Sequence, residues 1–119
     1  MIPSLKQIGV AILVLIAVDA VWLLTVGRYA VGMTERIQGS PVVFRYLPAL
    51  VVYVALAYLV YQADSVQNAA LIGAATYAVY DFTSLTILKK YETWIAVADT
   101  LWGGALFAIT FSILKRFGF

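Results

Sequence analysis

Four long apolar stretches decide what this chain can fold into. They run from about residue 5 to 27, 41 to 62, 68 to 88 and 93 to 114. Each is long enough to cross a bilayer as an α-helix, which takes about 20 mostly apolar residues. The apolar runs are continuous rather than alternating, and this pattern favours helices over a membrane β-barrel. The sequence therefore predicts one all-α integral membrane domain over residues 1–119, an antiparallel bundle of four transmembrane helices.

The composition supports a membrane environment and excludes several kinds of site. Of the 119 residues, 64% are hydrophobic and 12% are charged, whereas soluble domains are about 45–50% apolar and about 25% charged. The chain has no Cys and no His, so it has no disulfide, no thiolate site and no imidazole ligand or base. A net charge of +2 is too small and too dispersed for a nucleic-acid surface. We expect the lipid bilayer as the surroundings and no nucleic-acid partner.

The segments between the apolar stretches predict the topology. Residues 61–68 and 89–92 predict tight turns between antiparallel helices. Residues 28–41 form a longer loop, in which Met33–Gln38 extends the first helix or lies along the interface. Five Lys and Arg residues lie on the long-loop side and three on the side of the termini. The positive-inside rule then predicts insertion in the plasma (inner) membrane with both termini outside the cytoplasm.

Three aspartates lie inside the apolar stretches at a similar depth. Asp19, Asp81 and Asp99 each lie a few residues from a helix end on the long-loop side. At 1.5 Å per residue, this spacing places all three about 10 Å below one surface. A central Asp in lipid costs about 2.5–3.5 kcal/mol. The three carboxyl groups are therefore expected to face the bundle interior and to be paired or protonated.

Two of these aspartates belong to a repeated motif, Asp19-x-x-Trp22 and Asp99-x-x-Trp102. Residues three apart share a helix face, and antiparallel threading brings both motifs to the same buried layer. We expect each Trp to cover the carboxyl groups or to donate its N–H to a neighbour, with Trp22 nearer the loop surface and Trp102 deeper. The carboxyl groups should titrate as a coupled group. At least one should be protonated at neutral pH unless Arg45 or a bound cation neutralises the layer.

Further polar residues share the faces that carry the aspartates. In the third stretch, Tyr77 and Ser84 fall on the face of Asp81, and Tyr80 and Thr83 flank it. We expect Tyr77 or Tyr80 to donate a hydrogen bond to the aspartates. The second stretch carries a tyrosine stripe of Tyr46, Tyr53 and Tyr61. Small residues that allow close helix approach are Gly73, Ala74, Ala75, Gly103, Gly104 and Ala105.

Charged and aromatic residues near the predicted helix ends have simpler interpretations. Arg45 either reaches the aspartate layer or extends back to the interface. We predict that its guanidinium approaches one of the three aspartates, because it is the only cation expected inside a helix on that side. Tyr29, Tyr91 and Trp94 are typical of an aromatic belt at the membrane surface. Glu92 is expected to be a solvated loop charge, as are Glu35, Arg36 and Asp64.

The order of the motifs resembles the domain of unknown function 2177 family, a group of small and mostly bacterial membrane proteins. The matching residues are Asp19, Trp22, Leu23, Tyr77, Tyr80, Asp81, Thr83, Leu85, Asp99, Trp102 and Gly103. Ser84 departs from the family pattern, in which Asn follows the Thr. The resemblance covers nearly the whole chain. It implies a helical membrane fold and no particular activity.

Three classes of function remain open for the aspartate layer. The first is a proton or cation pathway or a small transporter, acting as a homo-oligomer because four such helices hardly enclose a pore. The second is a non-catalytic accessory subunit of a larger membrane complex, with the aspartates as interhelix hydrogen-bond glue to Tyr and Trp. The third is an enzyme that binds Mg²⁺ through carboxylates. It is the weakest, because no activated nucleophile or phosphate-binding loop accompanies the acids. We expect no catalytic residue, cofactor or resident metal.

Overall fold

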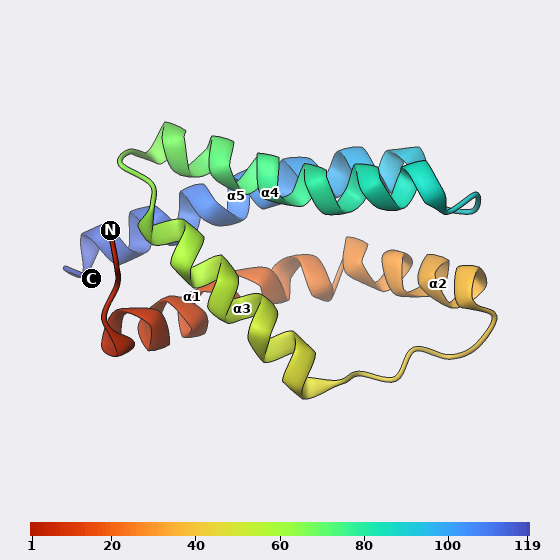
Figure 1. Ribbon diagram of the computed structural model, residues 1–119, viewed down its shortest axis with the longest axis horizontal. Helices are drawn as coiled ribbons and strands as arrows, with labels where there is room; N and C mark the ends of the chain where they lie inside the picture. Colours follow the sequence, from red (N-terminus) through yellow and green to blue (C-terminus); the bar gives the residue numbers. More distant parts are fainter.

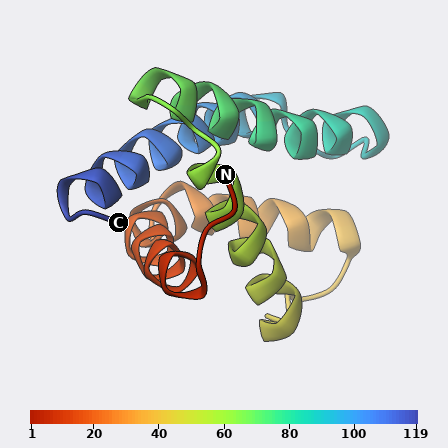
Figure 2. The same ribbon diagram turned by 60° about the vertical axis from the view of Figure 1, so that its left-hand side comes forward.

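The computed structural model describes residues 1–119 and consists of five α-helices without strands. The helices are α1 (Leu5–Leu23), α2 (Val26–Gln38), α3 (Tyr46–Tyr61), α4 (Val66–Ile87) and α5 (Thr93–Arg116). The α4–α5 pair forms one layer, α1 and α2 follow one another in a second layer, and α3 crosses obliquely (Figure 1, Figure 2). The all-α class is confirmed, whereas the number of helices and two boundaries differ from the prediction.

The two wrong boundaries each have a local cause. The first apolar stretch is not a single helix to its predicted end, since α1 ends at Leu23 and a separate helix, α2, begins at Val26. At the break, the Thr25 hydroxyl donates to two backbone carbonyls of the preceding turn at 2.7 and 3.3 Å. Residues 41–45 are not helical, so α3 begins at Tyr46. Pro48 then falls in the first turn of α3, where a missing N–H costs no intrahelical hydrogen bond.

The segment α2 occupies the part of the long loop that was expected to extend the first helix. It is a separate amphipathic helix. Its apolar residues Val26, Ala30, Met33 and Ile37 recur every three to four positions and pack against the start of α5 and the turn before it. Gly39 ends the helix in the left-handed conformation, with φ of 74°.

The contact between α4 and α5 depends on small residues. Gly73 lies directly against the Gly103 carbonyl and the Phe107 ring. A Cβ on Gly103 would lie 2.7 Å from the Gly73 carbonyl oxygen and would overlap the Tyr77 ring, and one on Gly104 would lie 3.2 Å from a backbone carbonyl of α4. The predicted close approach of these small faces is confirmed at the three glycines. It sets the register that brings the polar residues of α4 and α5 together.

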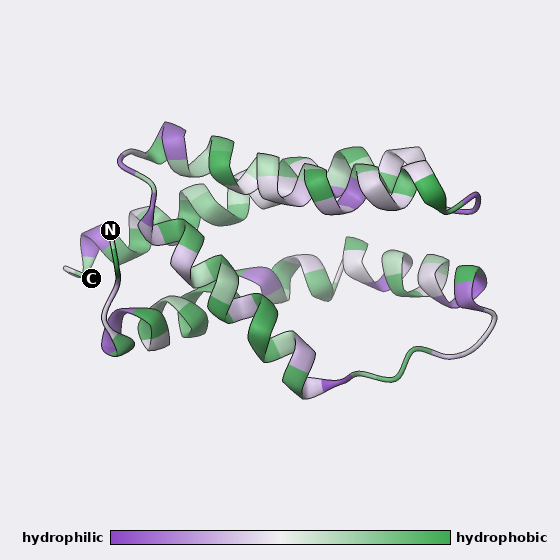
Figure 3. Cartoon of the chain, in the orientation of Figure 1, coloured by the Kyte–Doolittle hydropathy of each residue, from purple (hydrophilic) through white to green (hydrophobic).

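Much of the apolar surface is exposed. Only 21 of the 119 residues are buried. Hydrophobic residues recur along all five helices (Figure 3), and large apolar side chains are exposed on each of them, such as Leu13, Val31, Leu47, Leu71 and Leu101. Exposed apolar surface of this extent is typical of contact with a membrane or with partner proteins.

Two helices, α1 and α5, are long and apolar enough to cross a membrane. The helix α3 is apolar but has 16 residues, and α4 has 22 residues but falls short in hydropathy. The predicted set of four transmembrane helices is therefore not confirmed. The reason is physical: α3 loses its first turn to an extended segment, and α4 carries many of the polar residues of the candidate site.

Both chain termini lie at the same end of the molecule (Figure 1). The Met1 ammonium donates to Gln62 Oε1 at 3.0 Å, and Gln62 Nε2 donates to the Met1 carbonyl at 2.6 Å. Gln7 Nε2 donates to the Phe119 carbonyl at 3.2 Å. The side of a membrane that this end occupies stays a prediction.

Candidate functional site

The two Asp–Trp motifs meet each other across the contact between α1 and α5. Trp102 Nε1 donates to Asp19 Oδ1 at 2.9 Å, and Trp22 stacks on Trp102 with ring centroids 5.7 Å apart. The Tyr53 hydroxyl of α3 donates to Asp19 Oδ2 at 2.6 Å. Asp19 is 7% exposed. It joins three helices, and each of its carboxyl oxygens has a donor.

Asp81 on α4 is completely buried, with 0% of its surface exposed. The Tyr91 hydroxyl, from the turn between α4 and α5, donates to Asp81 Oδ1 at 2.6 Å. The other oxygen, Oδ2, is buried and has no hydrogen-bond partner. An unpaired buried polar atom loses the hydrogen bonds that it makes in water, at a cost of about 1–3 kcal/mol. Asp81 Oδ2 is thus the carboxyl oxygen of the Asp81–Asp99 neighbourhood that is buried without a donor.

Asp99 on α5 is a neighbour of Asp81 across the contact between α4 and α5, close enough for the two carboxyl groups to interact. Asp99 is half-buried and lines a pocket of ≈ 460 Å³ between α3, α4 and α5. The pocket is lined by Val52, Leu56, Thr76, Tyr77, Tyr80 and Asp99. Asp99 therefore connects the buried Asp81 carboxyl group to a pocket at the molecular surface.

The three aspartates gather around Tyr77 but occupy two successive helical turns. Tyr77 lies within electrostatic range of all three carboxyl groups. Asp19 accepts its hydrogen bond from Trp102, which lies one turn along α5 from Asp99, and one turn of helix rises about 5.4 Å. The structure thus brings Asp81 and Asp99 together as a pair and places Asp19 in a separate hydrogen-bonded group.

The expected N–H donation by a Trp is confirmed for Trp102, whereas the predicted tyrosine donors to the aspartates are wrong. Tyr53 and Tyr91 donate, rather than Tyr77 or Tyr80. A tyrosine hydroxyl lies far from its own backbone, so it meets a carboxyl group on a neighbouring element more easily than one on its own helix. Tyr80 is 64% exposed and borders the pocket instead.

The predicted pairing between Arg45 and an aspartate is also wrong. Arg45 is the exposed residue that precedes α3, and the ion pair of the structure joins Arg36 to Glu92 at 3.1 Å. Because α3 begins later than predicted, Arg45 lies outside the helix. Of the remaining candidate residues, Thr83 is exposed and Ser84 is half-buried.

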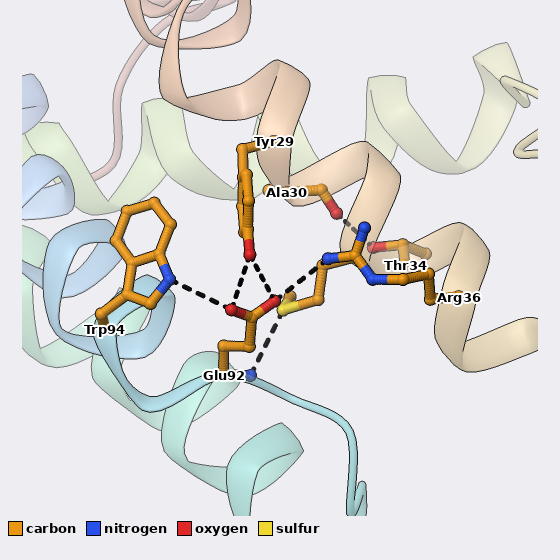
Figure 4. Close-up of polar contacts among 7 residues, drawn as sticks. Tyr29, Ala30, Thr34, Arg36, Glu92 and Trp94 are labelled. Carbon is orange, nitrogen blue, oxygen red and sulfur yellow. Dashed lines mark hydrogen bonds and ion pairs between the residues drawn. The ribbon is translucent and has the colours of Figure 1, made fainter.

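Glu92 organises a second polar cluster, between α2 and the start of α5 (Figure 4). The Tyr29 hydroxyl donates to both carboxylate oxygens, at 2.6 and 2.8 Å. Arg36 Nη2 and Trp94 Nε1 donate at 3.1 and 3.2 Å. Chiefly through the hydrogen bond from Tyr29, this environment holds the pKa of Glu92 below its usual range. Glu92 and Arg36 are solvent-accessible, as predicted, but Arg36 lies in α2 and not in a loop, and the two side chains form an ion pair that the prediction did not include.

Tyr91 links this second cluster to the aspartates. It was predicted to belong to an aromatic belt, but it is 9% exposed and packs with Met33 of α2. The backbone N–H of the next residue, Glu92, donates to Met33 Sδ at 3.3 Å. The helix α2 thus covers the residue that donates to Asp81. Nothing in the local sequence distinguishes Tyr91 from a surface tyrosine, because its partners come from α2 and α4.

The fold and the carboxyl cluster define a small all-α protein of the membrane type, in which a few acids and tyrosines are gathered between apolar helices. The chain belongs to the family described as Predicted membrane protein (DUF2177), whose model matches residues 4–114. The resemblance seen in the sequence motifs is thereby confirmed. Comparison with curated proteins and comparison with solved structures each found no match.

Proposed function

We propose that this protein is a small proton-coupled membrane transporter in which Asp81 and Asp99 hold one proton between them. The observation that carries the proposal is the buried Asp81 Oδ2, which has no hydrogen-bond partner and belongs to a carboxyl group that interacts with the neighbouring Asp99. A proton on Asp99 would donate to this oxygen in a short O–H···O hydrogen bond. It would also remove the repulsion between two neighbouring negative charges.

The proposed topology has α1, α3, α4 and α5 crossing the membrane and α2 lying along its surface. It is supported by exposed apolar side chains on the two shorter or more polar spans, Val51 and Val54 on α3 and Leu71 and Val79 on α4. The helix α3 has 16 residues, which rise about 24 Å. The extended segment before it includes three more exposed apolar residues, Val42, Val43 and Phe44, and these lengthen its apolar span.

The route of the proton follows from the position of Asp99. The Asp81 carboxyl group is completely buried, whereas Asp99 borders the pocket between α3, α4 and α5. Protons would enter and leave the pair through this pocket. A site of this kind suits a carrier, which loads and releases one proton per cycle, better than it suits an open pore. Action as a homo-oligomer is part of the proposal.

The proposal is tested by measuring proton movement in proteoliposomes that contain a pH-sensitive dye. With an imposed membrane potential, the natural protein should acidify the lumen faster than protein-free vesicles do. The Asp99→Asn variant should reduce this rate at least tenfold. Asp64→Asn is the matched control, because Asp64 is an exposed acid in the loop before α4.

An infrared measurement tests the bound proton directly. We expect a carboxylic C=O band from the natural protein at pH 7, lost in Asp99→Asn and retained in Asp64→Asn. Absence of this band in the natural protein, together with absence of proton movement, would contradict the proposal.

An accessory role is the second candidate, and Asp19 favours it. Asp19 accepts hydrogen bonds from α3 and α5 through both of its oxygens, which is the arrangement expected of interhelix glue. Purification from mild detergent separates the two functions. An accessory subunit would co-purify with a larger membrane complex in fixed stoichiometry and would move no protons by itself.

A further inference from the structure

The pocket beside the Asp81–Asp99 pair has the size and lining of a small-molecule site. Its volume is ≈ 460 Å³, and sites for small ligands measure about 300–1,000 Å³. The lining combines one carboxyl group, from Asp99, with two aromatic rings, from Tyr77 and Tyr80. Apolar side chains of α3, Val52 and Leu56, form the facing wall.

The charge of this lining selects for cations. No Lys or Arg lines the pocket, and Asp99 is its one ionisable carboxyl group. Aromatic ring faces attract ammonium groups, and aromatic side chains are the usual recognition elements for quaternary ammonium ligands. The Thr76 hydroxyl donates to the Ile72 carbonyl at 2.7 Å, so the hydroxyl groups left free in the lining are those of Tyr77 and Tyr80.

The border of the pocket indicates that the cationic ligand also carries apolar groups. Val52 is 53% exposed and Tyr80 is 64% exposed, so the pocket is approached past apolar and aromatic side chains. An inorganic cation would lose its water at this border without receiving enough oxygen ligands, since Ca²⁺ takes about 6–8 and Mg²⁺ about 6. An ammonium ion that carries its own hydrocarbon groups matches both the border and the wall.

We infer that this pocket binds a small amphiphilic organic ammonium ion, which takes the place of the proton held by Asp81 and Asp99. The inference rests on the proposed proton binding and names the substrate class of the same site. One positive charge enters and one proton leaves, so the net charge of the site is unchanged and no covalent bond is made or broken. Binding of the two cations would be mutually exclusive, so an ammonium ion in the pocket would compete with the proton that the site carries.

The test uses the full chain in a maltoside detergent, which contains no ammonium group, with benzyltrimethylammonium as the probe. Neopentylbenzene, the neutral molecule with carbon in place of nitrogen, is the matched control ligand. We expect calorimetry to show at least tenfold tighter binding of the ammonium probe than of the neutral one. A pH dye in weak buffer should report release of a proton on binding.

Variants of the pocket separate its parts. Asp99→Asn should weaken ammonium binding at least tenfold and abolish proton release, while Asp64→Asn should change neither. Tyr80→Leu should weaken binding about threefold or more, and Tyr80→Phe, which keeps the ring, should not. Tyr80 is exposed, so this pair remains informative if Asp99→Asn fails to fold. Competition by glycerophosphocholine would assign the ammonium group to a lipid headgroup, and its failure to compete would assign it to a free amine.

Equal binding of neopentylbenzene and benzyltrimethylammonium would overturn the inference, as would ammonium binding that is unchanged in both Asp99→Asn and Tyr80→Leu. The infrared band of the protonated carboxyl group distinguishes this failure from that of the proposed function. If the band is present while the ammonium probe does not bind, proton binding stands and the ammonium inference is wrong. If the band and the binding are both absent, both are wrong.

Discussion

At the scale of single residues, the three aspartates differ in how their oxygens are satisfied. Asp19 has a donor for each oxygen, whereas Asp81 has one donor and one unpaired oxygen. Asp99 supplies the neighbouring carboxyl group. A buried carboxylate with its full set of donors is stabilised as an anion, whereas one that lacks a donor is destabilised. The same residue type in similar helical positions therefore lies in two different environments, and the proposed proton site rests on this difference.

The role of Asp19 predicts the effect of removing its donor on α3. In Tyr53→Phe, the ring is kept and the hydrogen bond to Asp19 Oδ2 is lost. We expect a loss of about 1–3 kcal/mol in the free energy of unfolding, because a buried acceptor is left without a donor. Thermal unfolding in detergent measures this loss. The control is Tyr58→Phe on the same helix, since Tyr58 is exposed and the hydrogen bond that it accepts from Gln62 uses its backbone carbonyl, which the substitution keeps. Equal stability of the two variants would show that Asp19 is not a structural acceptor.

At the scale of helices, α4 and α5 form a close pair and α2 is a docked element. The pair depends on glycine, because the two backbones approach too closely for a Cβ. The docking of α2 depends on Glu92, which receives hydrogen bonds from Tyr29 and Arg36 of α2. Exposed charge pairs of this kind contribute little by themselves. The buried contacts of Met33 with Tyr91 supply the apolar part of the same interface.

The glycine contact predicts a strong effect of one added methyl group. Gly73→Ala places a Cβ against the Gly103 carbonyl and the Phe107 ring, and we expect a loss of stability of about 1–3 kcal/mol from overpacking. Gly9→Ala on α1 is the matched control, because nothing lies within 4 Å of its added Cβ. This control should be neutral or slightly stabilising, since Ala favours helices. An equal shift of the thermal unfolding midpoint in the two variants would contradict the close contact at Gly73.

The lowered pKa of Glu92 predicts how the docking of α2 responds to pH. Because this pKa lies below the ordinary value of about 4.3, the charged carboxylate stabilises docking at neutral pH. The stabilisation is lost as the pH falls through the lowered pKa. We expect amide hydrogen exchange in α2 to accelerate in this acid range. Comparing the natural protein with Glu92→Gln at each pH cancels the intrinsic pH dependence of amide exchange, which is the same in both proteins. The variant should lack the acid-dependent change, and the same change in both proteins would assign it to another group.

At the scale of the whole molecule, the polar contacts of the termini, the Glu92 cluster and the Asp81–Asp99 pair lie at different positions. The termini and the contacts of Gln62 with Met1 lie at one end. The second polar cluster, around Glu92, lies toward the other end, and the Asp81–Asp99 pair lies at the contact between α4 and α5. Exposed apolar side chains surround all of them. This arrangement suits a protein whose sides face lipid and whose two ends face water.

The proposed topology of four membrane spans predicts a simple labelling pattern. The chain has no Cys, so single cysteines can be introduced at Ser4 and Phe117 near the termini and at Ser40 in the long loop. A membrane-impermeant maleimide added to sealed, uniformly oriented vesicles should label Ser4→Cys and Phe117→Cys from the same side and Ser40→Cys from the other. Labelling of Ser4→Cys and Phe117→Cys from opposite sides would contradict an even number of spans.

Local properties of the sequence were enough to predict the all-α class and the presence of acids within apolar helices. Hydropathy and the spacing of Asp19 from Trp22 are properties of a single helix. Helical periodicity decides which residues share a face, and it does not depend on which helix packs against that face. The close approach at Gly73 and Gly103 was likewise visible as small residues. The motif order was enough to predict the family, which the family model confirms.

Only the tertiary structure decided which side chain donates a hydrogen bond to which carboxyl group. Tyr53 lies 34 positions from Asp19, and Tyr29 lies 63 positions from Glu92. Such partners depend on where the chain bends and how helices cross, which a local pattern does not contain. The break after Leu23 and the late start of α3 moved Arg45 out of reach of the aspartates and placed Tyr91 beneath α2. Hydrogen bonds act over about 3 Å, so displacement by one helical turn is enough to exchange one donor for another.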